Sequence, residues 1–131
     1  MKATLTWLSN MSTNATIIVQ RPGAILPEFA SIYTHWDGYP SHHGKILLEN
    51  YNTYEKVVEL IQLGQLSELH STPDACISYH RWRGEDKNIR VSSTINDHTD
   101  QEYSYLFRDG AWFYKYAGVF RPLTSEACAN D

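Results

Sequence analysis

Cysteine is scarce in this sequence: Cys76 and Cys128, 52 positions apart, are the two that occur in 131 residues. This spacing gives no CxxC redox motif and no cysteine-based zinc pattern, and the chain lacks the cysteine density of a small secreted scaffold. We therefore expect two reduced thiols, no disulfide, and a cytoplasmic protein.

Long apolar runs are also missing, since no stretch approaches the roughly 18 residues that a membrane helix needs. The first eight residues hold one lysine and an apolar stretch shorter than that of a secretory signal, and polar residues follow. We expect no membrane contact. The regular pattern begins only after Met11, so we interpret residues 1–131 as a single domain in which residues 1–10 are a candidate N-terminal appendage.

The sequence has no excess of positive charge, with 11 Lys and Arg against 15 Asp and Glu and a net charge of -4. Nonspecific coating of DNA requires clustered positive charge, so this class is excluded and no direct nucleic-acid contact is expected. Residues 28–75 are the acidic part, with seven acids against two bases, whereas residues 76–131 hold eight acids against seven bases. This acidic part is either a solvated helix face or an acidic docking surface.

Motifs of common catalytic sites are absent as well: there is no GxSxG, no P-loop, no GxGxxG and no HExxH. We therefore expect a protein that is not an enzyme and needs no cofactor and no metal. General acid–base catalysis would draw on a histidine or carboxylate held in a cleft. The candidates are His35, Asp37, His80, Glu85 and Asp86. A small hydrolase or metalloprotein centred on His35, Asp37 and His80 is thus a further alternative.

Aromatic residues are abundant, at 13% of the chain. Asp109-Gly110 lies between two β-type runs and predicts a two-residue hairpin turn. Cross-strand partners then have numbers that sum to 219, which puts six aromatic side chains on one face. These pairs are Phe107 with Trp112, Tyr105 with Tyr114, and Tyr103 with Tyr116. The face either packs beneath helices or remains exposed as an interaction surface.

The chain as a whole predicts an α+β fold, with an antiparallel sheet of about five to six strands and two helices packed on one face. The expected strands are residues 15–20, 29–35, 77–82, 89–95, 103–108 and 111–117. The expected helices are residues 42–51 and a second helix after Asn52, which has capping-box spacing to Glu55. Leu66 and Leu69 are expected to continue this helix beyond Gly64.

Two loops carry most of the unusual chemistry. The first, residues 33–44, contains three histidines, Trp36, Asp37 and Tyr39, and predicts a sharp strand-to-helix corner with Trp36 in the core. Its alternative use is a metal site of His35, Asp37 and His42 or His43, joined by His80 or His98, although the spacing matches no standard zinc pattern.

The second loop, residues 80–90, surrounds Trp82 with basic residues that could hold a phosphate or stack a base. Glu85 and Asp86 offset half of that charge, which favours a solvated loop. A nucleotide-signal-binding protein is therefore the alternative function. It would stack a base on Trp36 or Trp82 and bind phosphate with Arg81, Arg83 or Arg90.

Four segments, residues 12–17, 35–40, 60–64 and 79–86, together resemble small accessory proteins of phages, plasmids and other mobile elements. The distinctive one is His-Trp-Asp-Gly-Tyr-Pro at residues 35–40. The resemblance implies an antagonist of host defence, of the kind that includes anti-CRISPR proteins, and it carries over no catalytic residue.

From this resemblance and the acidic, aromatic composition, we expect a stoichiometric inhibitor in the cytoplasm of a bacterial host. Its partner would be a host defence protein, for example a CRISPR effector subunit, bound through carboxylates and aromatic anchors. The candidate partner-binding residues are Trp36, Asp37, Tyr39, Glu49, Glu55, Glu59, Trp82, Asp97, Asp100 and Glu102.

Overall fold

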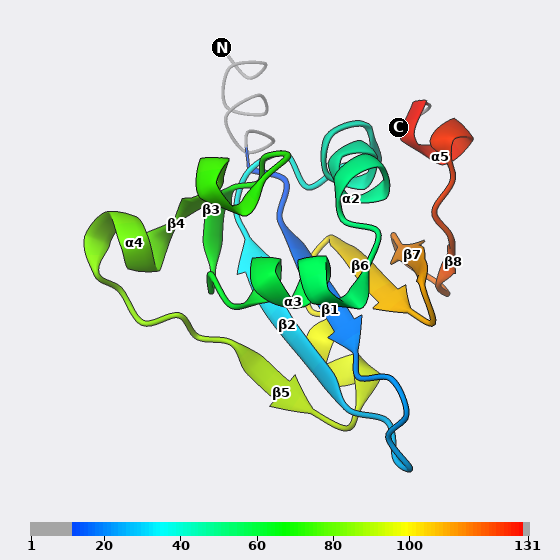
Figure 1. Ribbon diagram of the computed structural model, residues 1–131. Helices are drawn as coiled ribbons and strands as arrows, with labels where there is room; N and C mark the ends of the chain where they lie inside the picture. Colours follow the sequence, from blue (N-terminus) through cyan, green and yellow to red (C-terminus); the bar gives the residue numbers. More distant parts are fainter. Residues whose placement is uncertain (1–11, 130–131) are drawn as a thin grey trace.

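The computed structural model describes residues 12–129. Its centre is a mixed β-sheet of eight strands (Figure 1). The candidate appendage, residues 1–10, lies outside the described residues. The strand order is β4-β3-β2-β1-β6-β7-β8, with β5 paired to β2. The strands are β1 (Ala15–Gln20), β2 (Phe29–Thr34), β3 (Leu66–Glu68), β4 (Ile77–Ser78), β5 (Arg90–Ser92), β6 (Tyr103–Arg108), β7 (Ala111–Lys115) and β8 (Arg121–Pro122).

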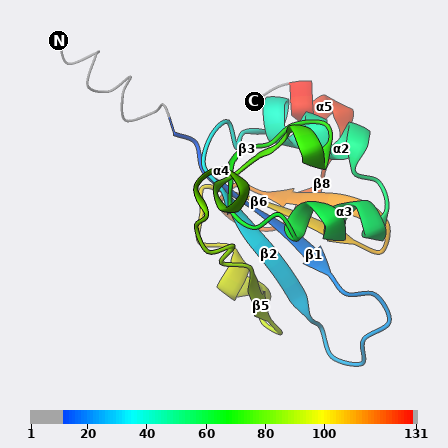
Figure 2. The ribbon, with the colours of Figure 1, turned by 60° about the vertical axis from the view of Figure 1, so that its left-hand side comes forward.

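Helical segments cover both faces of this sheet. They are the π-helical turn η1 (Pro40–Gly44), α2 (Lys45–Asn50), α3 (Tyr54–Ile61), the 3-10 turns η2 (Pro73–Ala75) and η3 (Ile95–His98), α4 (Tyr79–Arg83) and α5 (Ser125–Ala129). Figure 2 shows α2 and α3 on one side of β1 and β2, and the turn η3 on the other. No helix in the described range of the chain is long and apolar enough to cross a membrane.

The central strand β1 is mostly apolar because both of its faces are buried, and its buried polar residue, Thr16, donates to the His98 carbonyl oxygen at 2.7 Å. Ala15, Ile17 and Val19 point into the larger core beneath α2 and α3, while Ile18 joins a smaller core with Phe29 on the opposite face. A strand buried on both faces has no solvent side to favour polar residues. The predicted strand at 15–20 is confirmed.

The predicted C-terminal hairpin is confirmed in its turn and in its register. Phe107 pairs with Trp112 and Tyr105 with Tyr114. Tyr105 and Trp112 are buried, and the Trp112 indole N–H donates to the Tyr51 carbonyl oxygen at 2.8 Å. Strand β7 ends before Tyr116, whose ring nevertheless stacks on Tyr103 with centroids 4.7 Å apart. Most of the aromatic face is therefore core rather than an exposed interaction surface.

The α+β class is confirmed, but the sheet is mixed and has eight strands rather than being antiparallel with about five to six. Strand β1 runs parallel to β6, and β2 runs parallel to β3. Between β2 and β3 the chain passes through η1, α2 and α3. A helical connection of this kind brings the chain back to the same end of the sheet, which makes the next strand parallel.

Two predicted strands are shorter in the structure: residues 77–82 are mostly helical, and residues 89–95 contain a strand of three residues. In residues 77–82 the strand ends at Ser78, whose hydroxyl accepts from the Arg81 backbone N–H at 3.3 Å and so caps α4. In residues 89–95 the strand covers Arg90–Ser92, and Ile95 begins η3. In both places a serine hydroxyl accepts from a backbone N–H further along the chain, Ser78 from Arg81 and Ser92 from Thr94, where the strand ends.

The second helix is placed correctly, but its ends differ from expectation. Its cap is Thr53, which accepts from the Lys56 backbone N–H at 3.2 Å, rather than Asn52. After Gly64, at φ 80°, the chain forms strand β3 from Leu66 instead of another helical turn. A Cβ on Gly64 would stand 2.6 Å from Cβ of Lys87, so the close approach of that segment also requires glycine.

Candidate functional site

The corner at residues 35–40, the most distinctive motif of the sequence, is built into the core. Gly38 lies so close to the start of β1 that a Cβ would stand 2.8 Å from the Thr13 carbonyl oxygen and 2.9 Å from Cβ of Ala15. The Tyr105 hydroxyl donates to the Gly38 carbonyl oxygen at 2.6 Å. Glycine at this position is therefore required by packing, with no need of a ligand to explain it.

His43 stabilises the same corner through hydrogen bonds of its ring. Its Nδ1 lies 2.8 Å from the Asp37 carbonyl oxygen, and its Nε2 lies 2.7 Å from the Thr34 hydroxyl. Complete burial, together with the neighbouring His42, lowers the pKa of His43 to about 3. The His43 ring is thus neutral. It donates a hydrogen bond from Nδ1 to the Asp37 carbonyl oxygen and accepts one at Nε2 from the Thr34 hydroxyl. It is a structural histidine rather than a catalytic base.

The other predicted side chains of the corner are half-buried. The Asp37 carboxylate accepts from the Tyr39 hydroxyl at 2.8 Å, and Asp37 adopts a left-handed φ of 60°. Trp36, expected in the core, is half-buried with its ring edge-on to His35 at 4.5 Å between centroids. The corner interpretation therefore accounts for this loop, apart from the position of Trp36.

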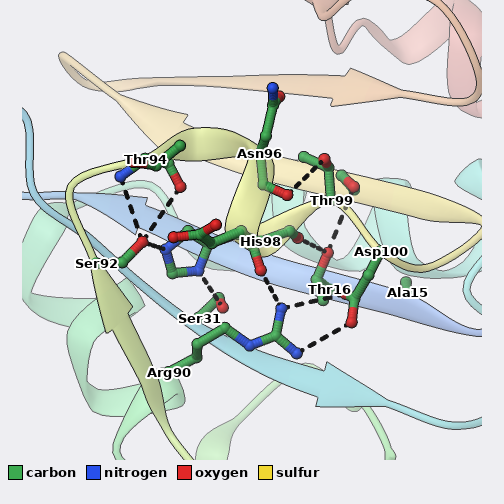
Figure 3. A network of polar contacts seen from close by, with 12 residues as sticks. Ala15, Thr16, Ser31, Arg90, Ser92, Thr94, Asn96, His98, Thr99 and Asp100 are labelled. Carbon is green, nitrogen blue, oxygen red and sulfur yellow. Dashed lines mark hydrogen bonds and ion pairs between the residues drawn. The ribbon is translucent and has the colours of Figure 1, made fainter.

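A second polar network lies on the opposite face of the sheet (Figure 3). Buried His98 contacts the Ser31 hydroxyl at 2.6 Å through Nδ1 and the Ser92 hydroxyl at 3.0 Å through Nε2. Burial, and then the charge of Arg90, lower the pKa of His98. Although the Ser31–His98 distance suits a nucleophile and its base, the two residues are 1% and 0% exposed. No substrate can reach them, so this pair fastens η3 to β2.

Arg90 and Asp100 complete this network. Each guanidinium Nη lies 3.2 Å from an Asp100 carboxylate oxygen, and Nη1 also donates to the Asp97 carbonyl oxygen. Burial raises the pKa of Asp100, but hydrogen bonds and charge from Arg90 outweigh it and hold that pKa below its ordinary value. Arg90 and Asp100 are thus engaged within the fold.

A hollow lies elsewhere, over β3 and β4 and between η2 and α4, and we call it the α4 hollow. Its volume is about 580 Å³, within the range of small-ligand sites. Figure 1 places these elements together at one end of the sheet. The hollow is lined by Ser67, Glu68, Asp74, Cys76, Ile77, Ser78, Arg81 and Trp82.

Trp82 is the exposed aromatic of the α4 hollow, with 61% of its surface accessible. The Tyr79 ring stacks on it with centroids 6.2 Å apart, and the Arg83 guanidinium carbon stands 4.8 Å from its centroid. Arg83 in turn pairs with Glu85 at 2.8 Å. The indole is therefore held in place from within the chain while remaining accessible.

Arg81 and Cys76 close one wall of the hollow. The Arg81 guanidinium donates through Nη2 to the carbonyl oxygens of Pro73 and Cys76. The Cys76 sulfur is buried and accepts from the His70 backbone N–H at 3.3 Å. Burial raises the pKa of the Cys76 thiol, which disfavours the nucleophilic thiolate. Arg81 and Cys76 therefore stabilise this wall of the α4 hollow.

The structure brings some of the predicted site residues together and separates others. Arg81, Trp82 and Arg83 share α4, whereas Arg90 belongs to the η3 network. The predicted acids fall on opposite faces of the sheet. Glu49, Glu55 and Glu59 are exposed on α2 and α3, and Asp97, Asp100 and Glu102 are exposed in and after η3.

Sequence reasoning missed Glu68 and Asp74, the two carboxylates of the α4 hollow. Glu68 was expected in a helical continuation and Asp74 in no element, because the short β3 and η2 leave no periodic signal. The sequence did offer one signal for these two residues, since both lie in the acidic part, residues 28–75.

Nothing in the described part supports the metal hypothesis or a family assignment. Between residues 12 and 129, no three His, Cys, Asp or Glu side chains are grouped so that they could hold a metal ion. His80 instead contacts the Glu85 carbonyl oxygen at 2.9 Å through Nδ1. Comparisons with protein-family models, curated proteins and solved structures gave no match to the chain.

Proposed function

We propose that this protein is a stoichiometric inhibitor that binds a bacterial defence protein, of the anti-CRISPR kind, and that the α4 hollow is the centre of its interface. The observation that carries the proposal is an exposed tryptophan, Trp82, that lines one hollow with the carboxylates of Glu68 and Asp74. Tryptophan dominates the hot spots of protein interfaces, where it anchors in the partner.

The anchor is supported by its own neighbours. Tyr79 and Arg83 hold the Trp82 ring, so binding costs little additional side-chain entropy. The hollow also lies on regular elements, β3, β4 and α4. A pre-organised surface of this kind favours recognition of a partner without a conformational change.

The choice of partner rests on charge and on the resemblance of residues 35–40 to mobile-element proteins. Proteins that handle nucleic acid present basic channels, and an acidic inhibitor is steered toward them. Residues 28–75 carry seven acids against two bases, and Glu68 and Asp74 belong to this stretch. Both partners would meet in the cytoplasm of the bacterial host.

The nucleotide-binding alternative receives less support from the same hollow. The Arg81 Nη2 already donates to the carbonyl oxygens of Pro73 and Cys76, which reduces the number of donors that Arg81 offers a phosphate. Glu68 and Asp74 would repel an anion that entered. A phosphate ligand would therefore meet unfavourable charge and a guanidinium with fewer donors to offer.

Phage plaquing on strains that each carry one CRISPR system targeting the phage tests the proposal. We expect expression of the chain to restore plaques on at least one strain, and Trp82→Ala to abolish this effect. Tyr116→Ala is the matched control, because Tyr116 is another exposed aromatic, at 55%, remote from the hollow in sequence. The absence of restoration on every strain would contradict an anti-CRISPR role, and full activity of Trp82→Ala would remove the hollow from the interface.

Charge reversal then separates the three acidic regions. One variant reverses Glu68 and Asp74, a second reverses Glu49, Glu55 and Glu59, and a third reverses Asp97 and Glu102. We expect the first variant to lose the most inhibition. Equal losses in all three would indicate general electrostatic steering rather than a defined interface.

A further inference from the structure

We propose that the α4 hollow holds one cationic side chain, an arginine or a lysine, presented by a segment of the partner protein. This inference deepens the proposed function, on which it depends for the biological partner. The preference for a cation, however, is a property of the isolated chain and can be measured on it alone.

The charges that line the hollow favour a cation. Glu68 and Asp74 contribute two carboxylates, against the single guanidinium of Arg81. The His70 Nε2 lies 3.2 Å from the Glu68 carboxylate, whose side chain keeps 44% of its surface exposed. The Glu68 carboxylate is thus held in place and remains reachable from solvent.

The aromatic side of the hollow suits the same ligand. An indole attracts a cation placed within about 6 Å of its centroid. The Trp82 ring already carries the Arg83 guanidinium at 4.8 Å, while the same residue also lines the hollow. A partner side chain that entered the hollow would therefore meet a lining that contains both an indole and two carboxylates.

Arg81 lines the hollow and is held on its wall. Its Nη2 donates to the carbonyl oxygens of Pro73 and Cys76, which ties α4 to η2 and to the residue before β4. A volume of about 580 Å³ exceeds what a metal ion or water cluster needs and accommodates a long, flexible side chain. A side chain with its charge at the tip suits a hollow of this size with two carboxylates in its lining.

The test follows the Trp82 indole N–H resonance in ¹H–¹⁵N NMR spectra of the purified chain, assigned by its loss in Trp82→Phe. The probes are acetylated, amidated tripeptides with arginine, lysine, glutamine or phosphoserine between two glycines. We expect saturable shifts with the arginine and lysine peptides at low salt, and none with the glutamine and phosphoserine peptides. Binding should weaken as salt is added, because the carboxylates are exposed to solvent.

Isosteric neutralisation identifies the carboxylates. Glu68→Gln with Asp74→Asn should raise the Kd for the arginine peptide at least about five-fold, the size expected for two exposed charge pairs. Glu55→Gln with Asp97→Asn is the matched control and should leave the Kd unchanged. Saturation by phosphoserine alone, equal shifts with arginine and glutamine, or no shift with any peptide would each overturn the inference. Peptide binding without restored plaques would contradict only the proposed partner.

Discussion

The Tyr105 hydroxyl donates a hydrogen bond of 2.6 Å to the Gly38 carbonyl oxygen, across 67 positions of sequence. It joins the aromatic face of the C-terminal hairpin to the corner at residues 35–40. Both groups are buried, so neither has water as an alternative partner. The two most conspicuous sequence features of this chain are therefore parts of one core contact.

Removing this hydroxyl leaves a buried carbonyl without its partner. We expect Tyr105→Phe to lower the free energy of unfolding by about 1–3 kcal/mol, because the ring is kept and the desolvated Gly38 oxygen is left unsatisfied. Urea denaturation measures this change. Tyr116→Phe, on an exposed ring, should change stability by less than about 0.5 kcal/mol. Equal effects of the two substitutions would mean that the bond contributes nothing.

Gly38 is expected to be intolerant of even one methyl group. In Gly38→Ala the new Cβ meets the Thr13 carbonyl oxygen, at 2.8 Å, which belongs to the backbone and cannot rotate away. We expect a loss of about 1–3 kcal/mol or more.

Gly110→Ala is the control for that substitution, since Gly110 at φ 79° has open space around its Cβ position. Its cost should be limited to about 1–2 kcal/mol of left-handed strain. A Gly38→Ala chain as stable as the wild type in urea would show that the corner relaxes away from Thr13.

The start of α3 gives a prediction that separates two adjacent residues. Thr53 accepts from the Lys56 backbone N–H, so Thr53→Ala should cost about 1 kcal/mol of stability. Asn52→Ala should cost less than about 0.5 kcal/mol, because Asn52 is exposed and outside the cap. Thermal or urea unfolding of both variants provides the comparison, and a larger loss for Asn52→Ala would restore the capping box with Glu55.

The sequence predicts best what is local. Asp109-Gly110 determines a turn whose two strands are adjacent in the chain, so the register followed from counting outward from the turn. The parallel pairing of β1 with β6 could not be predicted in this way. Nothing near Ala15 or Tyr103 encodes a partner about 90 residues away, because this pairing is a long-range contact.

The same difference between local and long-range information applies to the candidate site. Trp82 and Arg81 were found because an Arg-Trp-Arg segment is conspicuous by itself. Glu68 and Asp74 were missed because they acquire a role only when β3 and η2 are placed beside α4. Sequence reasoning therefore found Trp82, the exposed aromatic of the α4 hollow, but not its two carboxylates.

His43 makes the stability of the protein depend on pH in a predictable direction. Burial lowers its folded-state pKa from 6.5 to about 3, so the unfolded chain binds the proton first as the pH falls. The contribution of His43 is complete above pH 6.5 and is lost as the pH falls below it, at up to about 1.4 kcal/mol per pH unit. Between pH 6.5 and 5 most carboxylates remain ionised, so this window isolates the histidines.

Urea denaturation at several pH values across this window measures that slope. We expect His43→Gln to be less stable at pH 7, because it disturbs the contacts to Thr34 and to the Asp37 carbonyl, but to lose stability less steeply as the pH falls. The remaining slope reports His98, whose pKa burial also lowers. Identical slopes in the wild type and His43→Gln would mean that His43 binds its proton in the folded chain as readily as in the unfolded one.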